Sequence, residues 1–507
     1  MARLLTHGRT GDVIAGLSVA VVAIPQSIAY ADLAGMPAVA GLYATALPPL
    51  VAAVFASSPY LMTGPVAITA LLTYGALSTR AEPGSPQYVT LGLALALLVG
   101  LIRIGLGLLR AGWVAYLMSQ PVLLGFVPAA ALLIASSQTA KAFGVEDSPD
   151  YDNQVFQAVW AVGHPGHWHA APLVVALLTI GVIVFGRRIH PLFPGVLLTA
   201  VVATALSATG AYPGPSVDHI PAGLPPFTAD DLPWSQLPSL TAAGAVIALV
   251  GFTEAASISR RFAAADRSRW DADREFVSQG AANVAAAFSG GFPCGGSFSR
   301  SAVARLSGAT TRLAGAVTGL TVLVFLPFAE VLEPMPLATL AGIVVSAVFG
   351  LLRFRAMWSL WRISAPQALI AWGTFAATLL LAPRIDIAVL IGIGGSLAVF
   401  VARALRLDVD VAVDGDLLSL TPRGVLWFGT AQRLDVAVSD ALAAHPWITR
   451  VNIDLYGIGR IDTTGALVLR SVLEHAREAG LVAELKRVPP QSAALTARIL
   501  DAGNALD

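Results

Sequence analysis

Two short stretches of the sequence place glycine or proline directly before a helix that starts inside an apolar region. The first reads YLMTGPVAITALL from Tyr60, and the second reads GGFPCGGSFSRSAVARL from Gly290. A helix that begins at membrane depth leaves backbone N–H groups unpaired, which is tolerated only inside protein or beside a wet cavity. Two such helix ends that meet at the membrane midplane favour an anion, because both positive dipole ends face it. The pair therefore predicts an anion-transport site.

We expect backbone N–H groups and hydroxyls at these two helix starts to bind the anion. Pro65 suits the first turn of a helix, because its missing N–H would have no partner there anyway. Serine hydroxyls in the second stretch add further donors. Close helix packing through small residues is the alternative explanation. The candidate ligands are Gly64, Val66, Ala67 and Ile68 in the first stretch and Gly296, Ser297, Phe298 and Ser299 in the second.

Gln26 follows Pro25 in the middle of the first apolar run, and Tyr30 lies one turn later on the same face. The Gln26 amide could donate to the substrate. It could equally satisfy the backbone groups that the proline frees.

Arg300, in the second stretch, is the one basic residue that we cannot assign to a connection between apolar runs. A charge inside the membrane is costly and usually functional. Arg300 could contact the anion, raise the positive potential near it, or pair with Glu254.

Glu254 lies in AVIALVGFTEAASIS, far from either end of an apolar run. It is either a structural partner for a hydroxyl or for Arg300, or the group that couples transport to a cation. Burial favours the neutral carboxyl and a nearby arginine favours the carboxylate, so the prevailing form stays open. We expect a proton rather than sodium, because Thr253 and Ser257 are the few other oxygen ligands nearby. Asp32, near the outer end of the first run, is expected to be solvated.

The composition excludes an ordinary soluble enzyme. Hydrophobic residues make up 56% of the 507 residues and charged residues 12%, whereas soluble domains carry about 25% charged residues. The net charge of zero gives no reason to expect a nucleic-acid partner. Cys294 is the single cysteine, so a disulfide within the chain and a CxxC metal site are both excluded. No nucleophile–base constellation, P-loop or metal cluster is evident, and we expect no enzyme activity, cofactor or metal.

Apolar runs fall into two sets of seven. The short third member of each set is interrupted by glycine or proline, which is the sequence pattern of an inverted-repeat transporter. The runs lie near 12–34, 38–56, 62–79, 88–109, 119–140, 171–186 and 191–209, and near 240–263, 276–290, 296–306, 312–332, 336–352, 366–382 and 385–403.

The distribution of basic residues agrees with fourteen spans and two cytoplasmic termini. With the N-terminus inside, most arginines of residues 1–406, Arg103 among them, fall in cytoplasmic connections. Three basic residues fall outside: Arg80, Lys141 and Arg384. This asymmetry is what the positive-inside rule requires.

Residues 407–507 have a different residue pattern, because no apolar run in them is long enough to span a membrane. VNIDL at 451–455 alternates like a half-buried strand, and 430–445 and 465–478 have helical periodicity. We therefore predict a transmembrane transport domain at 1–406 and a small cytoplasmic α/β domain at 407–507.

Four motifs in chain order carry a resemblance to one family. AIPQSIAYADLAGMPAVAGLYATALPPL, from Ala23, resembles the signature of the SulP anion transporters, the sulfate-permease-like solute carriers that include prestin. MTGPVAITALL and GSFSRSAV resemble the third and tenth spans of that family. NIDLYGIGRIDTTGALVL resembles the core of its cytoplasmic STAS domain. The likeness covers nearly the whole chain.

The resemblance implies a polytopic α-helical membrane protein whose 14 spans form a seven-plus-seven inverted repeat of the uracil-permease type. A core domain (spans 1–4 and 8–11) would move against a gate domain. The resemblance also implies a homodimer in the inner (plasma) membrane, with the substrate between the two interrupted spans, next to Gln26 and Tyr30. An acidic residue at the position of Glu254 would handle a proton or sodium.

In bacterial STAS regulators a phosphorylated Ser or Thr occupies the turn that matches Thr463 and Thr464, which makes these two residues regulatory candidates. Helix capping by Asp462 explains the same turn without any signalling role.

The expected function is a secondary active transporter of small anions, of the dicarboxylate, sulfate or bicarbonate class. We expect proton-coupled symport by an elevator movement. Sodium-coupled anion symport, an uncoupled channel or exchanger, an area motor and an anion receptor are the alternatives.

Overall fold

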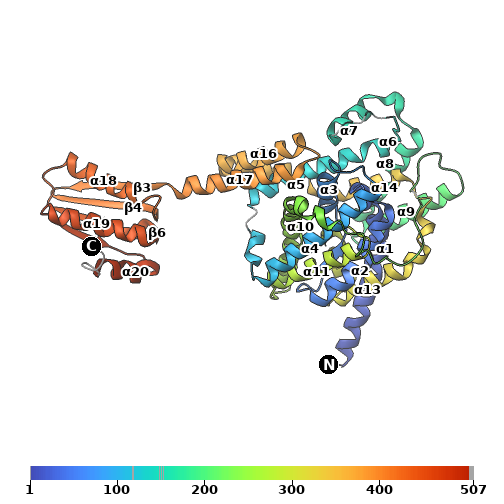
Figure 1. Ribbon diagram of the computed structural model, residues 1–507, viewed down its shortest axis with the longest axis horizontal. Helices are drawn as coiled ribbons and strands as arrows, with labels where there is room; N and C mark the ends of the chain where they lie inside the picture. The colour runs from blue at the N-terminus through green and yellow to red at the C-terminus, as the bar shows by residue number, and fades with distance from the viewer. Residues whose placement is uncertain are drawn as a thin grey trace. The chain divides into compact units, whose positions relative to one another are not determined.

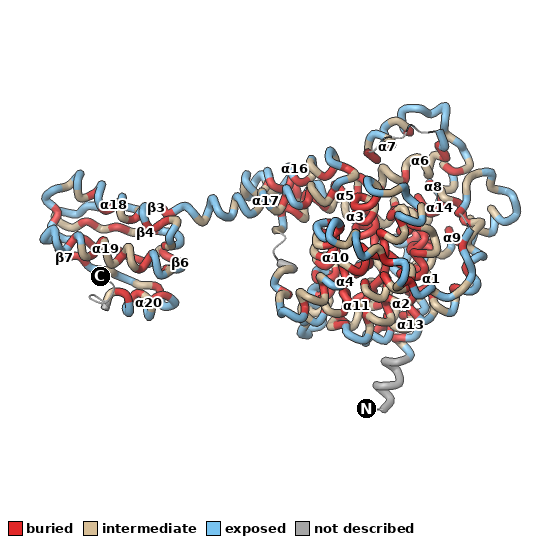
Figure 2. Tube along the Cα trace, in the orientation of Figure 1, coloured by how far each residue is buried: buried red, intermediate tan, exposed pale blue. Residues whose placement is uncertain are grey.

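The computed structural model describes residues 2–116, 119–147, 149, 151, 153–217 and 219–501. The chain folds into two compact units, Met1–Gly394 and Gly395–Asp507 (Figure 1). Buried residues concentrate inside the helical unit and between the sheet and helices of the second unit (Figure 2). Residue 1 and residues 502–507, the chain ends that we expect in the cytoplasm, lie outside the described residues.

Every predicted apolar run contains a helix. In the first set these are α1 (Ala2–Leu33), α2 (Ala38–Phe55), α3 (Ala67–Leu77), α4 (Pro86–Leu108), α5 (Gln120–Ser137), α8 (Ala170–Ile189) and α9 (Gly195–Ala208). In the second they are α10 (Leu237–Ala265), α11 (Ala272–Phe288), α12 (Phe298–Leu306), α13 (Leu313–Phe325), α14 (Leu337–Val348), α16 (Ala365–Leu380) and α17 (Ile385–Ala404).

Length and composition alone identify fewer spans than fourteen. Within the described residues, nine helical stretches are long and apolar enough to cross a membrane, and three shorter apolar helices accompany them. The remaining predicted runs contain α11 and α12, which are shorter or more polar. The number of spans therefore stays a prediction.

Four helices were not predicted: α6 (Thr139–Phe143), α7 (Gln154–Gly163) and α15 (Phe354–Ile363) in the first unit, and α20 (Pro490–Asp501) in the second. Most of α7 is apolar, and it begins where the Asn153 side chain accepts a hydrogen bond from Val155 N. Short 3-10 turns occur at Gly112–Tyr116, Pro165–His167, Trp234–Gln236, Leu326–Leu332, Phe349–Leu351 and Leu455–Gly457.

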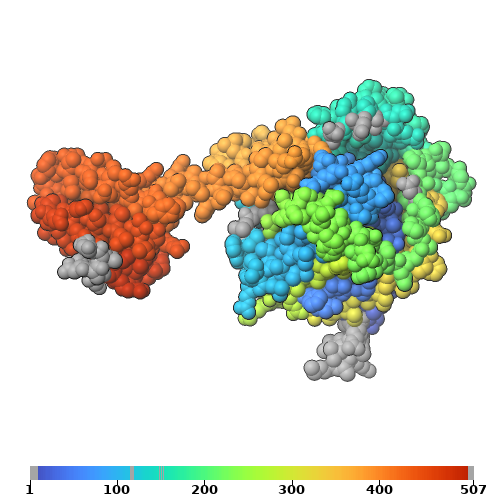
Figure 3. All heavy atoms as spheres, viewed as in Figure 1, coloured from blue at the N-terminus to red at the C-terminus, as the bar shows by residue number. Residues whose placement is uncertain are grey.

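The two halves of the helical unit interlock. Helix α10 of the second half packs against α3 and α4 of the first. Residues of α4 (blue) and α10 (green) lie side by side on the face shown in Figure 3. Before α3 and α12, short strands β1 (Met62–Gly64) and β2 (Gly295–Ser297) pair antiparallel. Met62 pairs with Ser297 and Gly64 with Gly295. The strand pair joins the two interrupted stretches that the sequence singled out.

One face of α11 supports this non-helical backbone. Glu275, Ser278, Gln279 and Asn283 repeat at helical spacing and are completely buried. The Glu275 carboxylate accepts from the backbone N–H groups of Ser57 and Ser58, at 3.1 and 2.8 Å. These bonds hold the turn that leads into β1.

The same face also holds both strands. Gln279 Nε2 donates to Thr63 Oγ1 in β1 at 2.8 Å. Asn283 Oδ1 accepts from Cys294 N at 2.8 Å, and its Nδ2 donates to Cys294 O at 3.1 Å. Buried backbone groups outside regular structure need such partners, because an unpaired one costs about 1–3 kcal/mol.

Arg103 does not lie in a cytoplasmic connection, so that prediction was wrong. It is fully buried on α4 and donates to three backbone carbonyls: Ala248 O at 3.1 Å, Cys294 O at 2.9 Å and Ile247 O at 3.2 Å. Gly251 makes room for it, since a Cβ there would lie 2.6 Å from Arg103 Nη2. The hydropathy pattern locates Arg103 near the end of a helix, but it does not reveal that the side chain points into the helical bundle.

The second unit is a five-stranded sheet with helices. Its elements are β3 (Leu407–Asp414), β4 (Leu417–Leu426), α18 (Ala431–Ala444), β5 (Arg450–Asp454), β6 (Ile458–Ile461), α19 (Thr463–Glu478), β7 (Val482–Lys486) and α20 (Pro490–Asp501). The strand order is β3-β4-β5-β7, with β6 on the far part of β4, and only β3 runs antiparallel to its neighbour. The predicted strand at 451–455 and helices at 430–445 and 465–478 are confirmed.

The start of α19 is capped as predicted. The Asp462 carboxylate accepts from Gly465 N at 2.7 Å, directly after β6. Thr463 and Thr464, the regulatory candidates, are exposed in the first turn of the helix.

Candidate anion-binding site

The candidate site is built on the starts of α3 and α12. Val66 precedes α3 with an extended backbone and without a side-chain cap, so the first N–H groups of α3, on Ala67 and Ile68, have no intrahelical partner. At α12, Ser297 caps Arg300 N at 3.4 Å and leaves the N–H groups of Phe298 and Ser299 uncapped. The pairing of β1 with β2 brings both sets of donors together.

Arg300 is the charge of this site. Its side chain is 1% exposed, and Nη2 donates to Pro65 O, at the start of the opposite stretch, at 2.5 Å. Nε and Nη1 are buried and have no hydrogen-bond partner. Among the described residues, no carboxylate lies within ion-pair distance of the guanidinium, so its charge is not neutralised there.

Glycine is required at position 64 for two reasons, the backbone conformation there and the close contact with Arg300. Its φ is +151°, a conformation that L side chains rarely adopt. A Cβ at this position would lie 2.9 Å from Arg300 Nη1. Gly64 therefore shapes the site by letting the guanidinium lie on the backbone of β1.

Gln26 and Tyr30 are buried on α1, which packs against both α3 and α12. The Gln26 Oε1 atom is buried without a partner. Tyr30 interacts electrostatically with both Arg300 and Glu254, which places its hydroxyl in the same region. An amide can present either its oxygen or its NH₂ after rotation about its last torsion, so Gln26 can act as a donor here.

Glu254 lies on α10 beside β2. It is half-buried, and a Cβ on Gly296 would lie 3.0 Å from the Cβ of the adjacent Ala255. Glu254 and Arg300 interact electrostatically but form no ion pair within the described part of the chain. The Thr253 hydroxyl donates to Val250 O at 2.6 Å, and Ser257 is exposed. The alternative in which Arg300 merely pairs with Glu254 is therefore wrong.

Phe298 and Ser299, the first two residues of α12, differ in their burial and in their contacts. The Phe298 ring is 45% exposed and lies under the Arg261 guanidinium, 5.4 Å from ring centroid to Cζ. Ser299 is half-buried, and its Oγ lies 3.4 Å from Ser297 Oγ. Phe298 thus offers the site its backbone N–H rather than its ring.

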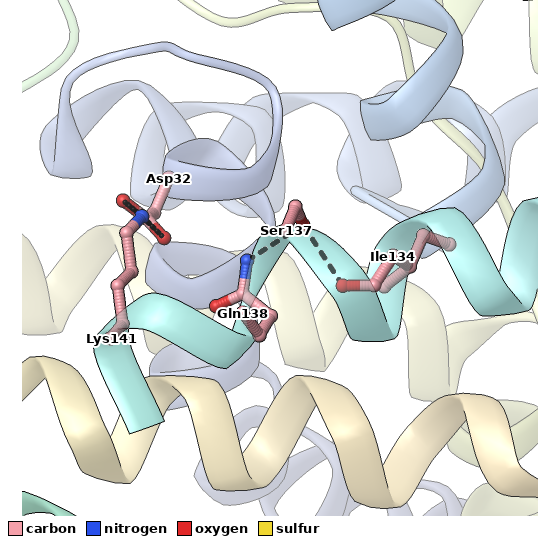
Figure 4. A network of polar contacts seen from close by, with 5 residues as sticks. All are labelled: Asp32, Ile134, Ser137, Gln138 and Lys141. Atoms are coloured by element: carbon pink, nitrogen blue, oxygen red, sulfur yellow. Dashed lines mark hydrogen bonds and ion pairs between the residues drawn. The ribbon is translucent and has the colours of Figure 1, made fainter. Parts of the chain in front are cut away.

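Asp32 is not merely solvated, so that expectation was wrong. Lys141 on α6 reaches the C-terminal end of α1, and its Nζ lies 2.6 Å from both carboxylate oxygens of Asp32 (Figure 4). The two side chains are 25% and 31% exposed. The sequence placed both residues on the outer side but did not reveal their contact, because 109 positions separate them.

Sequence reasoning also missed the supporting residues of the site. The polar stripe of α11 was visible at positions 275, 278, 279 and 283, whereas the inward direction of Arg103 left no sequence signal. Across the described residues, no group of three or more His, Cys, Asp or Glu residues could hold a metal ion.

Comparisons with protein families and curated proteins give consistent matches. The sulfate permease family model matches residues 10–374, and the STAS domain model matches residues 408–503. A probable sulfate transporter of Mycobacterium tuberculosis (strain H37Rv) is 34% identical over 374 residues, 73% of this chain and 66% of that protein. The chloroplastic sulfate transporter 4.1 of Arabidopsis thaliana is 33% identical over 402 residues, 76% of this chain and 57% of that protein. The matches span about two thirds or less of these relatives' own length.

Two solved structures support the fold. The murine Slc26a9 anion transporter, solved in the inward-facing state, is 20% identical, with a TM-score of 0.88 over 98% of this chain and 88% of that chain. The transmembrane domain of the cyanobacterial bicarbonate transporter BicA is 25% identical, with a TM-score of 0.65 over 76% of this chain and 97% of that chain. The predicted helical transporter fold with a C-terminal STAS domain is confirmed.

The substitution Phe298→Pro tests whether the start of α12 binds an anion. Proline fits the first position of a helix, and Ser297 before it already has the extended backbone that proline requires. The change therefore removes one N–H, and Phe298→Ala is the matched control that loses only the ring. The measurement is the affinity for sulfate, bicarbonate, oxalate or succinate, determined by ligand-induced thermal stabilisation. We expect the affinity to be weaker by about tenfold or more in Phe298→Pro than in Phe298→Ala, because a hydrogen bond to a charged group contributes about 1.5–3 kcal/mol. Equal affinities would exclude this N–H as a ligand.

Proposed function

The chain belongs to the sulfate permease family, a family of transporters rather than enzymes, and from this premise we propose that it is a secondary active transporter of small anions. Sulfate, bicarbonate and dicarboxylates are the candidate substrates. The relatives named for sulfate and the structural neighbour named for bicarbonate support this class.

The unneutralised guanidinium of Arg300 carries the proposal. A buried cation without a counter-charge is costly, and each buried N–H without a partner adds to that cost. A small oxyanion between α3 and α12 removes both costs, because its oxygens can accept from Nε, from Nη1 and from the free backbone N–H groups.

Uptake of radiolabelled sulfate, bicarbonate, oxalate and succinate into proteoliposomes tests this proposal and identifies the substrate. We expect Arg300→Gln to lose at least tenfold in uptake of the transported anion, because the site then lacks its positive charge. Arg300→Lys keeps the charge without the planar fork and should retain part of the activity. Wild-type uptake by a correctly inserted Arg300→Gln variant would refute the site.

We also propose alternating access by an elevator movement of the core domain. At one end, the Asp32–Lys141 pair joins α1 of the core to α6, which follows the gate helix α5. At the other end, a cavity of about 370 Å³ separates α1 and α12 of the core from α8 and α9 of the gate. Alternating access requires two states, each closed at one end and open at the other. The ion pair at one end and the cavity at the other correspond to one of these two states.

The ion pair should stabilise the state that is closed at the Asp32 end. A partly exposed pair contributes about 1 kcal/mol or less, so Asp32→Asn or Lys141→Gln should shift the population toward the opposite state by up to about fivefold. The reporter is Ser18→Cys, in the wall of the cavity, in a Cys294→Ser background, labelled with a membrane-impermeant maleimide. We expect slower labelling in either single variant and recovery in the charge-reversed pair Asp32→Lys with Lys141→Asp. Unchanged labelling in both single variants would contradict the role of the pair.

We propose that Glu254 couples transport to a proton. It lies beside β2, within electrostatic reach of Arg300 and Tyr30, and forms no hydrogen bond or ion pair within the described residues. A neutral carboxyl avoids repelling an incoming anion, so a proton and an anion would load together. The nearby oxygen ligands are too few for sodium, since the Thr253 hydroxyl is already bonded to its own helix.

The variant Glu254→Gln mimics the protonated state and separates the coupling alternatives. It should lose anion accumulation driven by an imposed pH step but keep anion binding and exchange. The measurement is uptake with sodium absent and then present, in wild type and variant. Proton-driven accumulation in the variant would exclude Glu254 as the coupling group. A strict sodium requirement in wild type would favour sodium-coupled symport, and current without a coupled ion would favour a channel.

Several further features remain proposals: a homodimer, the inner (plasma) membrane as location, and cytoplasmic termini. Phosphorylation of Thr463 or Thr464 belongs with them. Both hydroxyls are exposed at a helix start, which favours a phosphate, although the Asp462 carboxylate in the same turn opposes it.

A further inference from the structure

The cavity between α1, α8, α9 and α12 leads toward the anion site. Val22 in its wall precedes Gln26 by about one turn of α1, and Val303 follows Ser299 by about one turn of α12. The same two helices therefore form both the cavity wall and the site. Helices α8 and α9 form the rest of the cavity wall. An anion that reaches or leaves the site through this cavity therefore passes α8 and α9.

Arg187 on α8 is the single charged residue among those that line this cavity. It is exposed, and it makes no hydrogen bond or ion pair with the described residues. Of the polar lining residues, Ser18 already donates its hydroxyl to Ile14 O at 2.8 Å. The wall is otherwise mostly apolar, so nothing there opposes the field of the guanidinium.

The field of Arg187 extends inward. Arg187 acts electrostatically on Tyr30, which lies beside Arg300 in the anion site. Apolar walls of low dielectric constant concentrate such a field and raise the local concentration of ions of opposite charge. The two arginines thus present successive positive charges along one path.

We propose that Arg187 forms a second anion subsite, at which the transported anion is held in the cavity before it enters, or after it leaves, the Arg300 site. The inference rests on the proposed function. The subsite binds small oxyanions through charge and one guanidinium fork, and it favours divalent over monovalent anions because the attraction scales with charge. It sets the apparent affinity on one side of the membrane only.

Arg188 provides a matched control. It has the same charge and lies at the next position, but its guanidinium stacks on the Phe185 ring at 5.4 Å and is absent from the cavity wall. A general effect of charge at this helix end, on insertion or on lipid contact, would appear in both variants. An effect of the subsite would appear only in Arg187→Gln.

The experiment measures initial uptake rates in proteoliposomes of defined orientation, for the anion identified in the uptake panel, at low and high ionic strength. The cavity side is defined as the side from which Ser18→Cys is labelled. We expect Arg187→Gln to raise KM on that side about 3- to 10-fold at low ionic strength, with little change in maximal rate and a weaker salt dependence. Arg187→Lys keeps the charge but loses the planar fork, so its KM should lie between those of wild type and Arg187→Gln, whereas Arg188→Gln should match wild type.

Ser307→Asp keeps Arg187 but adds a carboxylate to the same wall, and it should also raise KM on the cavity side. This variant tests the subsite even where Arg187→Gln fails to insert. Equal effects of Arg187→Gln and Arg188→Gln, equal effects on the two sides, or a lower maximal rate at constant KM would each overturn the subsite. If Arg187→Gln behaves like wild type while Arg300→Gln loses uptake, the subsite is wrong and the proposed function stands.

Discussion

The structure depends on satisfying a backbone that leaves its helices in an apolar environment. Around Met62–Gly64 and Gly295–Ser297 the chain is neither helical nor exposed, so its N–H and C=O groups need partners from the protein. The two strands supply part of these partners to each other, and buried side chains of α11 supply others. The polar face of α11 is therefore as much a part of the site as the residues that would touch an anion.

The two buried arginines illustrate how the same side chain serves different purposes. Arg103 directs Nε, Nη1 and Nη2 to backbone carbonyls and so fixes Cys294, next to β2, against α10. Arg300 has a single protein acceptor, and two of its nitrogens are left buried and unpaired. All three groups of Arg103 thus have acceptors within the protein, whereas an anion would supply the acceptors that Arg300 lacks. Counting charges in the membrane would not distinguish them, but counting their acceptors does.

The sequence predicted much of the fold because the signals involved are local. Apolar runs, breakers and the Asp462 cap each depend on a few neighbouring residues, and each corresponds to an element in the structure. The meeting of β1 with β2 also followed, because interrupted spans in matching places imply an inverted repeat. The contact of Asp32 with Lys141 and the inward turn of Arg103 depend on the direction of long side chains and on distant partners. Neither periodicity nor hydropathy encodes that information.

The short strand pair also limits which insertions and deletions the chain can accept. Each strand has three residues, and their register places Gly64 opposite Gly295. One added residue in either stretch would move a side chain to the place where Gly64 lies against Arg300, and it would turn every following side chain to the other face. Between each strand and its helix no loop could absorb the change, because α3 and α12 begin within three residues of the strands. The lengths of the two stretches are therefore fixed together, so that a change of length in one could be accommodated only by a compensating change in the other.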